Sequence, residues 1–166
     1  MTVVDKIATV LLAVVGMELF AWSMHKYVMH GWGWAWHRDH HEPHDGVLER
    51  NDLFAVVFGS IVVALFTIGY FVSERLWWAA MGITVYGAIY AFIHDGLVHQ
   101  RLFRWTPKRG YAKRLVQAHR LHHATIGKEG GVSFGFVVAR DPARLKADLK
   151  RQREAGTAVV RPASVD

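Results

Sequence analysis

Histidine is the residue with the clearest chemical pattern in this 166-residue sequence. Eleven histidines fall within two stretches, residues 25–44 and 94–123. Each stretch holds an HX4H pair followed by an HX2HH triple, in the same order. Neutral imidazole binds Zn, Cu, Fe and Ni, and ten imidazoles exceed what one ion can use, so we predict two metals with about five ligands each. The predicted ligands are His25, His30, His37, His40, His41, His94, His99, His119, His122 and His123.

The spacing within each motif predicts how its side chains are presented. Residues at i, i+3 and i+4 share one face of an α-helix, so each HX2HH triple can converge on one side. The HX4H separation turns the second histidine about 140° away from the first, at about 100° per residue. Each pair is therefore expected either to lie where a helix unwinds, near Gly31 and Gly96, or to reach two different metals.

The elements that position these histidines are apolar. Three runs, residues 7–24, 53–72 and 76–93, are long enough to cross a bilayer, for which a helix needs about 20 apolar residues. Only the first run contains a charge, Glu18. Each HX4H motif begins where such a run ends. We predict an all-α, polytopic membrane bundle of about three to four spans, with a helical cap that holds the dinuclear site.

Composition excludes several kinds of site, and the distribution of charge predicts how the protein is oriented in the membrane. The chain has no cysteine, which excludes disulfides, thiolate metal sites and cysteine nucleophiles. The net charge is +6, and fifteen of the twenty Lys and Arg residues follow His99. Because positive residues stay in the cytoplasm, the histidine cap (residues 25–52 and 94–139) is predicted on the cytoplasmic side. A basic surface beside a membrane suits anionic lipid head groups, so the net positive charge does not require a nucleic-acid partner.

The remaining segments complete one predicted membrane domain, residues 1–155, followed by a flexible C-terminal tail, residues 156–166. Residues 132–138 are apolar but too short to cross, and we expect them at the membrane interface. Residues 140–153 have the pattern of a surface helix, with Asp141 and Pro142 as its start signal.

Three further residues are candidates to support the ligands, because metal-bound histidine usually donates its other N–H to a carboxylate or carbonyl. Asp95 adjoins His94, and Glu18 lies two helical turns before His25 on the same face. For Glu18 the alternative is a hydrogen bond within the helix bundle. His44 departs from both motifs, and is either such a partner or a loop residue.

The order of the four motifs resembles the membrane fatty acid hydroxylase superfamily. The residues around the motifs resemble the bacterial β-carotene 3-hydroxylases in particular. The matching stretches are HEPHDGVLERNDL at residues 41–53, HDGLVHQR at 94–101, AHRLHHA at 118–124 and VSFGF at 132–136. The resemblance runs from about residue 18 to residue 149 and includes all ten predicted ligands.

This resemblance implies an enzyme of the bacterial inner membrane with a non-haem di-iron centre, which zinc could replace in a purified sample. It implies O2 as oxidant and electrons from a ferredoxin-type donor that NAD(P)H feeds. The implied reaction is hydroxylation of the carotenoid β-ring at C3, from β-carotene through β-cryptoxanthin to zeaxanthin. Keto-carotenoids, on the way to astaxanthin, are implied as further substrates.

A basic group beside the second histidine block could bind an acidic ferredoxin, since charge complementarity promotes such encounters. Contact with anionic lipid is the alternative. The group is Arg101, Arg104, Lys108, Arg109, Lys113 and Arg114.

Two other functions are compatible with the histidine motifs alone. One is a related membrane di-iron oxygenase, namely a carotenoid ketolase, a desaturase or a fatty acid hydroxylase. The other is a histidine-rich metal transporter. Transporters place polar ligands near the midplane of broken helices, whereas these histidines begin at the ends of the apolar runs, which disfavours transport.

Overall fold

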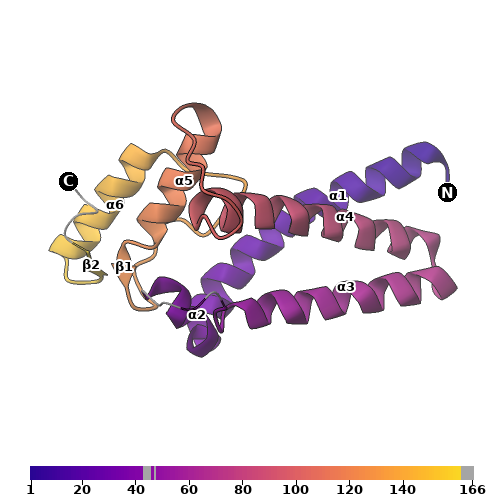
Figure 1. The fold of residues 1–166 in the computed structure, drawn as a ribbon, viewed down its shortest axis with the longest axis horizontal. Coiled ribbons are helices and arrows are strands. Elements are labelled where there is room, and N and C mark those ends of the chain that lie inside the picture. Colours follow the sequence, from indigo (N-terminus) through magenta and orange to yellow (C-terminus); the bar gives the residue numbers. More distant parts are fainter. Residues whose placement is uncertain (43–45, 47, 162–166) are drawn as a thin grey trace.

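The structure is a computed structural model that describes residues 1–42, 46 and 48–161. Three long helices extend to one side, and the short elements form a cap at their other end (Figure 1). The long helices are α1 (Val3–Ser23), α3 (Asp52–Val72) and α4 (Glu74–Ala91). In the described part of the chain, three helices are long and apolar enough to cross a membrane. The predicted helical membrane bundle is confirmed.

Side-chain caps fix where the first and third long helices begin. The Thr2 hydroxyl accepts a hydrogen bond from the Asp5 N–H, and the Asp5 carboxylate accepts one from the Thr2 N–H, which together form a capping box. For this reason α1 begins earlier than the predicted residue 7. The Ser73 hydroxyl caps α4 by accepting from the Leu76 N–H, and Ser73 alone separates α3 from α4.

The outer faces of the long helices are apolar and open. Leu12, Val15 and Val63 are 73%, 71% and 66% exposed, and α1 has no buried residue. A water-soluble monomer rarely exposes contiguous apolar surface on this scale. Helices satisfy all their backbone hydrogen bonds internally, so they can present such faces to lipid. The protein is therefore an integral membrane protein.

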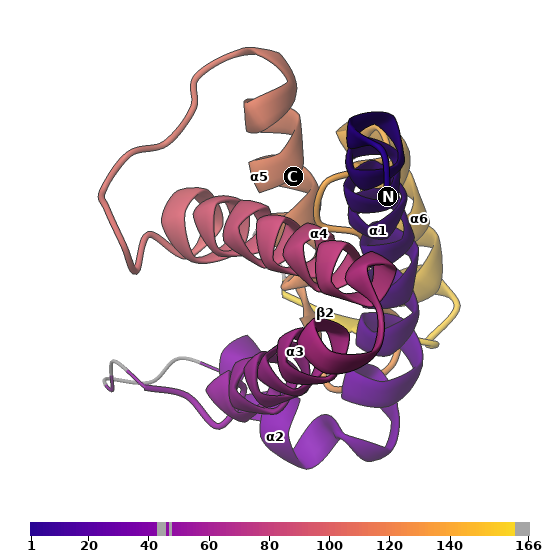
Figure 2. The same cartoon turned by 90° about the vertical axis from the view of Figure 1, so that its right-hand side faces the viewer.

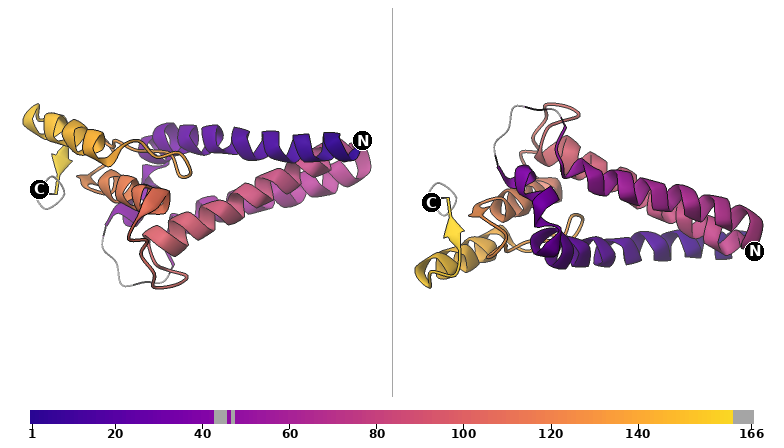
Figure 3. Two further views of the ribbon diagram at one scale, coloured as in Figure 1. Left: turned by 90° about the horizontal axis from the view of Figure 1, so that it is seen from above. Right: turned by 90° about the horizontal axis from the view of Figure 1, so that it is seen from below.

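The first and third spans touch near the N-terminus and separate toward the cap (Figure 3). They are close at Gly82, where a Cβ atom would lie 2.6 Å from the Ala13 Cβ. Residues 131–138 enter the opening between them. Within this segment the Phe136 ring is buried and lies 4.6 Å from that of Tyr90, whereas Val138 is 67% exposed. The position of residues 132–138 at the membrane interface stays a prediction.

The two ends of the bundle carry different charged groups. At the end away from the cap, the Glu74 carboxylate pairs with the N-terminal amine at 2.9 Å and with Lys6 Nζ at 2.7 Å. The ten histidines that the structure describes lie at the other end. The N-terminus and the α3–α4 turn therefore share one end, as the predicted orientation requires.

The cap consists of five helical segments and two short strands. Helix α6 begins at the predicted Asp141, whose carboxylate accepts from two backbone N–H groups. Its fully buried Leu145 and Leu149 pack in one cluster with Leu115 and Leu121 of α5. Figure 2 shows the 99–109 connection leading outward to one side before α5 begins. The segments are η1 (Met24–Trp32), α2 (Trp34–His41), η2 (Phe92–Val98), α5 (Gly110–His122), β1 (Thr125–Ile126), α6 (Pro142–Glu154) and β2 (Val159–Val160).

Part of the predicted flexible tail is packed against this cap. Strand β2 pairs with β1 in antiparallel register, Thr125 opposite Val160. The Arg161 N–H donates to the Ala124 carbonyl at 2.9 Å. Residues 159–161 thus have defined partners, which their polar surroundings in the sequence did not indicate. Residues 162–166 lie outside the described part.

Candidate metal centre

Both HX4H pairs coincide with π-helical turns: His25 and His30 lie in η1, and His94 lies in η2, whose C-cap is His99. A π-helix bonds residue i to residue i+5 and is frequent at functional sites. In η2 the His99 N–H donates to the His94 carbonyl at 2.9 Å, which is such a bond. The longer turn brings the two histidines of a pair to one side. Of the two alternatives that the sequence offered, the first, a pair that lies where the α-helix unwinds, agrees with these π-turns and with the non-helical φ and ψ of Gly31 (−112° and −121°).

Nine of the ten predicted ligands form two clusters of ring nitrogens that could each hold a metal ion. Within each cluster the ligand atoms lie within 4.8 Å of one another. The first cluster is His25, His30, His37, His41 and His122, and the second is His40, His94, His99 and His119. The clusters therefore do not correspond to the two sequence blocks.

The exchange between the blocks occurs at the middle histidine of each HX2HH triple. On α2, His37 and His41 point to the first cluster and His40 to the second. On α5, His119 belongs to the second cluster and His122 to the first. On an α-helix, the side chains at i and i+4 point in more similar directions than those at i and i+3. The first and last histidines of a triple can therefore share one cluster, while the middle histidine, at i+3, reaches the other cluster.

His123 is the tenth histidine, and it lies beside the second cluster. Its Nε2 is 2.9 Å from His119 Nε2. Its ring stacks on that of His41 with centroids 4.3 Å apart. By its place in the repeated motif, His123 corresponds to His41, so it is the candidate for a fifth ligand of the second cluster.

The spacing of facing nitrogens fits bound metal ions. Two nitrogens bound about 2.1 Å from one ion, at about 90–110°, lie about 3.0–3.4 Å apart. In the first cluster, His37 Nε2 is 3.2 Å from both His25 Nε2 and His41 Nε2. In the second, His40 Nε2 is 2.9 Å from His94 Nε2, and the His99 and His119 nitrogens are 3.4 Å apart.

The outer ring nitrogens show why a cation is needed between these rings. His25 Nδ1 lies 3.0 Å from the Phe134 carbonyl, and His37 Nδ1 lies 2.7 Å from Asn51 Oδ1. An imidazole nitrogen that faces an oxygen acceptor carries the proton, which leaves the Nε2 lone pair free. The two lone pairs then face each other at 3.2 Å. They repel unless a cation lies between them.

The second cluster has the same arrangement with carboxylate partners. His40 Nδ1 lies 2.5 Å from Glu49 Oε2, and His94 Nδ1 lies 2.9 Å from Asp95 Oδ1. Both Nε2 lone pairs again face the cluster. Each cluster thus contains one pair of unprotonated nitrogens held at ligand spacing, and the residues present fit two metal ions.

Burial keeps these imidazoles neutral, as metal binding requires. It lowers the pKa of His37 and His99 to about 3 and the pKa of His41 to about 2. Burial also holds the pKa of His122 and His123 well below the ordinary value. At neutral pH the rings therefore present lone pairs rather than protons to an ion.

Comparison with known proteins agrees with this geometry. The family model described as fatty acid hydroxylase matches residues 10–140. The chain belongs to the fatty acid hydroxylase family. No solved structure matches the chain.

Curated members of this hydroxylase family are closely similar over most of the chain. A "Beta-carotene hydroxylase" of Pseudescherichia vulneris is 56% identical over 86% of this chain and 82% of its own length. One from Paracoccus sp. (strain N81106 / MBIC 01143) is 56% identical over 87% and 88%. One from Pantoea ananas is 50% identical over 93% and 89%.

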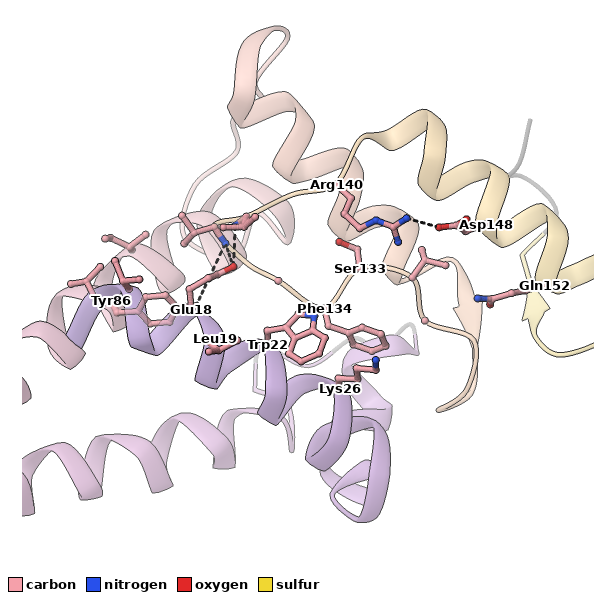
Figure 4. Close-up of a pocket in the computed structure, with 18 residues that line it drawn as sticks. Glu18, Leu19, Trp22, Lys26, Tyr86, Ser133, Phe134, Arg140, Asp148 and Gln152 are labelled. Carbon is pink, nitrogen blue, oxygen red and sulfur yellow. Dashed lines mark hydrogen bonds and ion pairs between the residues drawn. The ribbon is translucent and has the colours of Figure 1, made fainter. Parts of the chain in front are cut away.

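Glu18 supports the centre of this hydroxylase in a different way from the expected one. Its carboxylate accepts from the Phe136, Val137 and Val138 N–H groups at 3.0–3.2 Å, and from the Tyr86 hydroxyl at 2.7 Å (Figure 4). Three successive N–H groups around one carboxylate form an anion-binding nest. These hydrogen bonds are those of the bundle alternative, and they fix the segment whose Phe134 carbonyl faces His25.

Asp95 lies where we expected it, against His94, and one predicted docking residue joins it. The Arg101 guanidinium binds the Asp52 carboxylate at 2.8 and 2.9 Å and approaches Asp95 at 3.5 Å. Its partner Asp52 begins α3. Arg101 therefore links the connection after η2 to the start of the second span, and its role in docking an electron donor stays a prediction.

The other basic residues of the predicted group are spread over the 99–109 connection and α5. Arg104, Lys108, Arg109 and Lys113 are exposed. Arg114 donates through Nε to the Arg140 carbonyl at 3.3 Å. The predicted partner His44 lies outside the described residues.

Sequence reasoning missed two of the residues that orient ligands, Asn51 and Glu49. Both lie within the stretch at residues 41–53 that carried the resemblance, next to the start of α3. The signal was available, since a carboxylate and an amide lie eight and ten residues after His41, the last histidine of an HX2HH triple. Their distance in the chain from His37 and His40 concealed the contact.

Proposed function

We propose that this protein is a β-carotene 3-hydroxylase. The observation that carries the proposal is that curated relatives named beta-carotene hydroxylase match most of the chain. The two histidine clusters lie at the cap end of the membrane spans, and this position supports the oxidation of a lipid substrate. We therefore expect β-carotene to be converted to β-cryptoxanthin and then to zeaxanthin, and keto-carotenoids to be accepted as well.

Each hydroxylation replaces a C3–H bond of the β-ring by C3–OH. One oxygen atom of O2 enters the product and the other leaves as water, which requires two electrons and two protons. We propose two iron ions as the metals, held by the first and second clusters with His123 as the tenth ligand. When bound, iron supplies the O2 activation, which redox-inert zinc cannot supply even where it occupies the same nitrogens.

The protein's own groups hold the ligands and keep water away. Oxygen atoms of Phe134, Asn51, Glu49 and Asp95 each accept a ring N–H, which sets the tautomer and direction of the histidine. The Phe136 ring stacks on His25 with centroids 5.0 Å apart. This buried ring helps to exclude water from the first cluster.

We further propose that the cap faces the cytoplasm of a bacterial inner membrane, and that a ferredoxin fed by NAD(P)H supplies the electrons. The excess of Lys and Arg after His99 supports this orientation. The exposed cations of the 99–109 connection and α5 support an acidic donor.

The test is expression of the full chain in bacteria that accumulate β-carotene, and in parallel in bacteria that accumulate canthaxanthin. We expect chromatography to show β-cryptoxanthin and zeaxanthin in the first strain and hydroxylated keto-carotenoids in the second. Ring ketones or new double bonds would indicate a ketolase or a desaturase instead. Unchanged pigments in both strains, with the protein present in the membrane, would refute ring hydroxylation.

A further inference from the structure

A cleft of about 760 Å³ lies between α1 and residues 131–138 (Figure 4). We call it the α1 cleft. Its apolar part is formed by Val15, Leu19 and Trp22 on α1 and by Val137 and Val138 opposite. The volume is in the range of ligand pockets, about 300–1,000 Å³.

The mouth of the α1 cleft faces the lipid. Val15, Leu19 and Val138 are 71%, 68% and 67% exposed, and the first two lie on a membrane-spanning helix. An apolar molecule dissolved in the bilayer can therefore enter without crossing water. The cleft becomes polar at its other end, where Arg140 and Asp148 form an ion pair at 2.9 Å.

The inner wall of the cleft is thin and adjoins the first histidine cluster. Phe134 lines the cleft, and its ring lies 5.4, 5.3 and 5.1 Å from the rings of His25, His30 and His122. Gly131 lines it too, and a Cβ atom there would lie 3.4 Å from His122 Cε1. One aromatic ring and a glycine backbone thus separate the cleft from predicted metal ligands.

We propose that the α1 cleft is the route and binding site of the carotenoid. The polyene lies along α1 between Leu19 and Val138, and the end ring reaches Phe134 beside the first cluster. Contact with the Arg140–Asp148 ion pair is unfavourable for an apolar molecule, so we expect the carotenoid not to move beyond the polar end of the cleft. This inference rests on the proposed function, because the occupant is its substrate.

The test compares Leu19→Trp with Leu12→Trp in the β-carotene strain. Both leucines are exposed on α1 and lie two helical turns apart, but only Leu19 lines the cleft. Because added volume in a filled site typically costs a factor of about ten or more, Leu19→Trp should lower hydroxylated pigment about tenfold. Leu12→Trp should convert β-carotene like the unaltered protein, and both should keep their metal content.

The same assay separates the two proposals. Conversion by the unaltered protein tests the function, whereas equal conversion by Leu19→Trp and Leu12→Trp would overturn the cleft alone. Should Leu19→Trp lose metal, Val138→Trp on the opposite wall decides. A drop in conversion with metal retained supports the cleft, and unchanged conversion or lost metal in that variant overturns it.

Discussion

The two histidine clusters use the same ligand type but differ in what holds the ligands. In the first cluster, the oxygens that accept ring N–H groups belong to two backbone carbonyls and the Asn51 amide. In the second, they belong to the carboxylates of Glu49 and Asp95. A carboxylate partner raises the basicity of a bound imidazole more than a neutral oxygen does. From these partners we expect the second cluster to bind its ion more tightly.

The clusters also differ in access. All members of the first are buried, whereas His99 of the second is half-buried. A cavity of about 370 Å³ is lined by His40, His99 and His123 and also by His41 of the first cluster, with Arg120 and Arg161 at its side. The first cluster adjoins the lipid-facing cleft through Phe134. The first cluster is thus the one beside the proposed substrate, and most of the histidines at the second cavity belong to the second cluster or lie beside it.

The strongest test of the division removes a crossing histidine. His122→Ala should empty the first cluster although His122 belongs to the second sequence block, and His40→Ala should empty the second. Because losing a mere partner of a ligand already costs about 10- to 100-fold, we expect activity to fall by more than about 100-fold. Metal analysis should show about one ion per chain lost in each variant.

The control is Gln117→Ala, an exposed change on the same helix α5. Two ions retained in His122→Ala, with turnover intact, would remove His122 from the ligand set.

A second test exchanges the partners of the two clusters. Glu49→Gln replaces a carboxylate by a neutral amide, so we expect the affinity for one of the two ions to fall by about 10- to 100-fold. Asn51→Asp makes the opposite change beside His37 and should strengthen metal binding there. Competition with a chelator, followed by counting the retained ions, measures both. Identical retention curves for the two variants would show that partner charge does not distinguish the clusters.

The Glu18 nest tests how much the first cluster depends on the segment at residues 136–138. Glu18→Ala leaves three backbone N–H groups without their acceptor, which we expect to loosen the Phe134 carbonyl from His25 and to lower metal affinity about tenfold. Glu18→Gln keeps an acceptor oxygen and should restore binding to within about threefold. Metal retention is the readout, and equal losses in both variants would count against positioning through this nest.

Much of the fold follows from the sequence because its signals are local. Apolar run length predicted three spans, and Asp141 with Pro142 predicted the start of α6. The histidine motifs contained the ten residues that gather in the cap. The HX4H spacing was informative too. A five-residue spacing places two side chains on different sides of an α-helix, but it matches the i+5 hydrogen bonds of η1 and η2.

The remainder depends on contacts between distant segments. That His122 joins His25 and His30 follows from how α5 meets η1, which no spacing encodes. Residues 132–138 look like a plain apolar strip, but Glu18, far earlier in the chain, accepts the N–H groups of residues 136–138 and holds that backbone beside α1. Arg101 looks like a surface cation until Asp52, far earlier in the chain, is placed beside it.

The smallest expected effect concerns the aqueous side of the second cluster. The 99–109 connection continues directly from His99, and its Arg104 and Lys108 are exposed. If a ferredoxin docks there, the double change Arg104→Glu with Lys108→Glu should slow ferredoxin-driven hydroxylation about threefold at low salt. The difference should vanish at high salt, because exposed charges act on encounter rates and are screened. Lys150→Glu on α6 is the matched exposed control.

Peroxide-driven turnover is the control for this last test, because it needs no electron donor. It should be equal in the double variant and the unaltered protein, and the ferredoxin-driven rate alone should fall. A parallel loss of both rates would place these cations in support of the cap rather than in docking. A ferredoxin rate that is unaffected at every salt concentration would move the docking surface elsewhere, with Arg120 and Arg161 beside the second cluster the next pair to reverse.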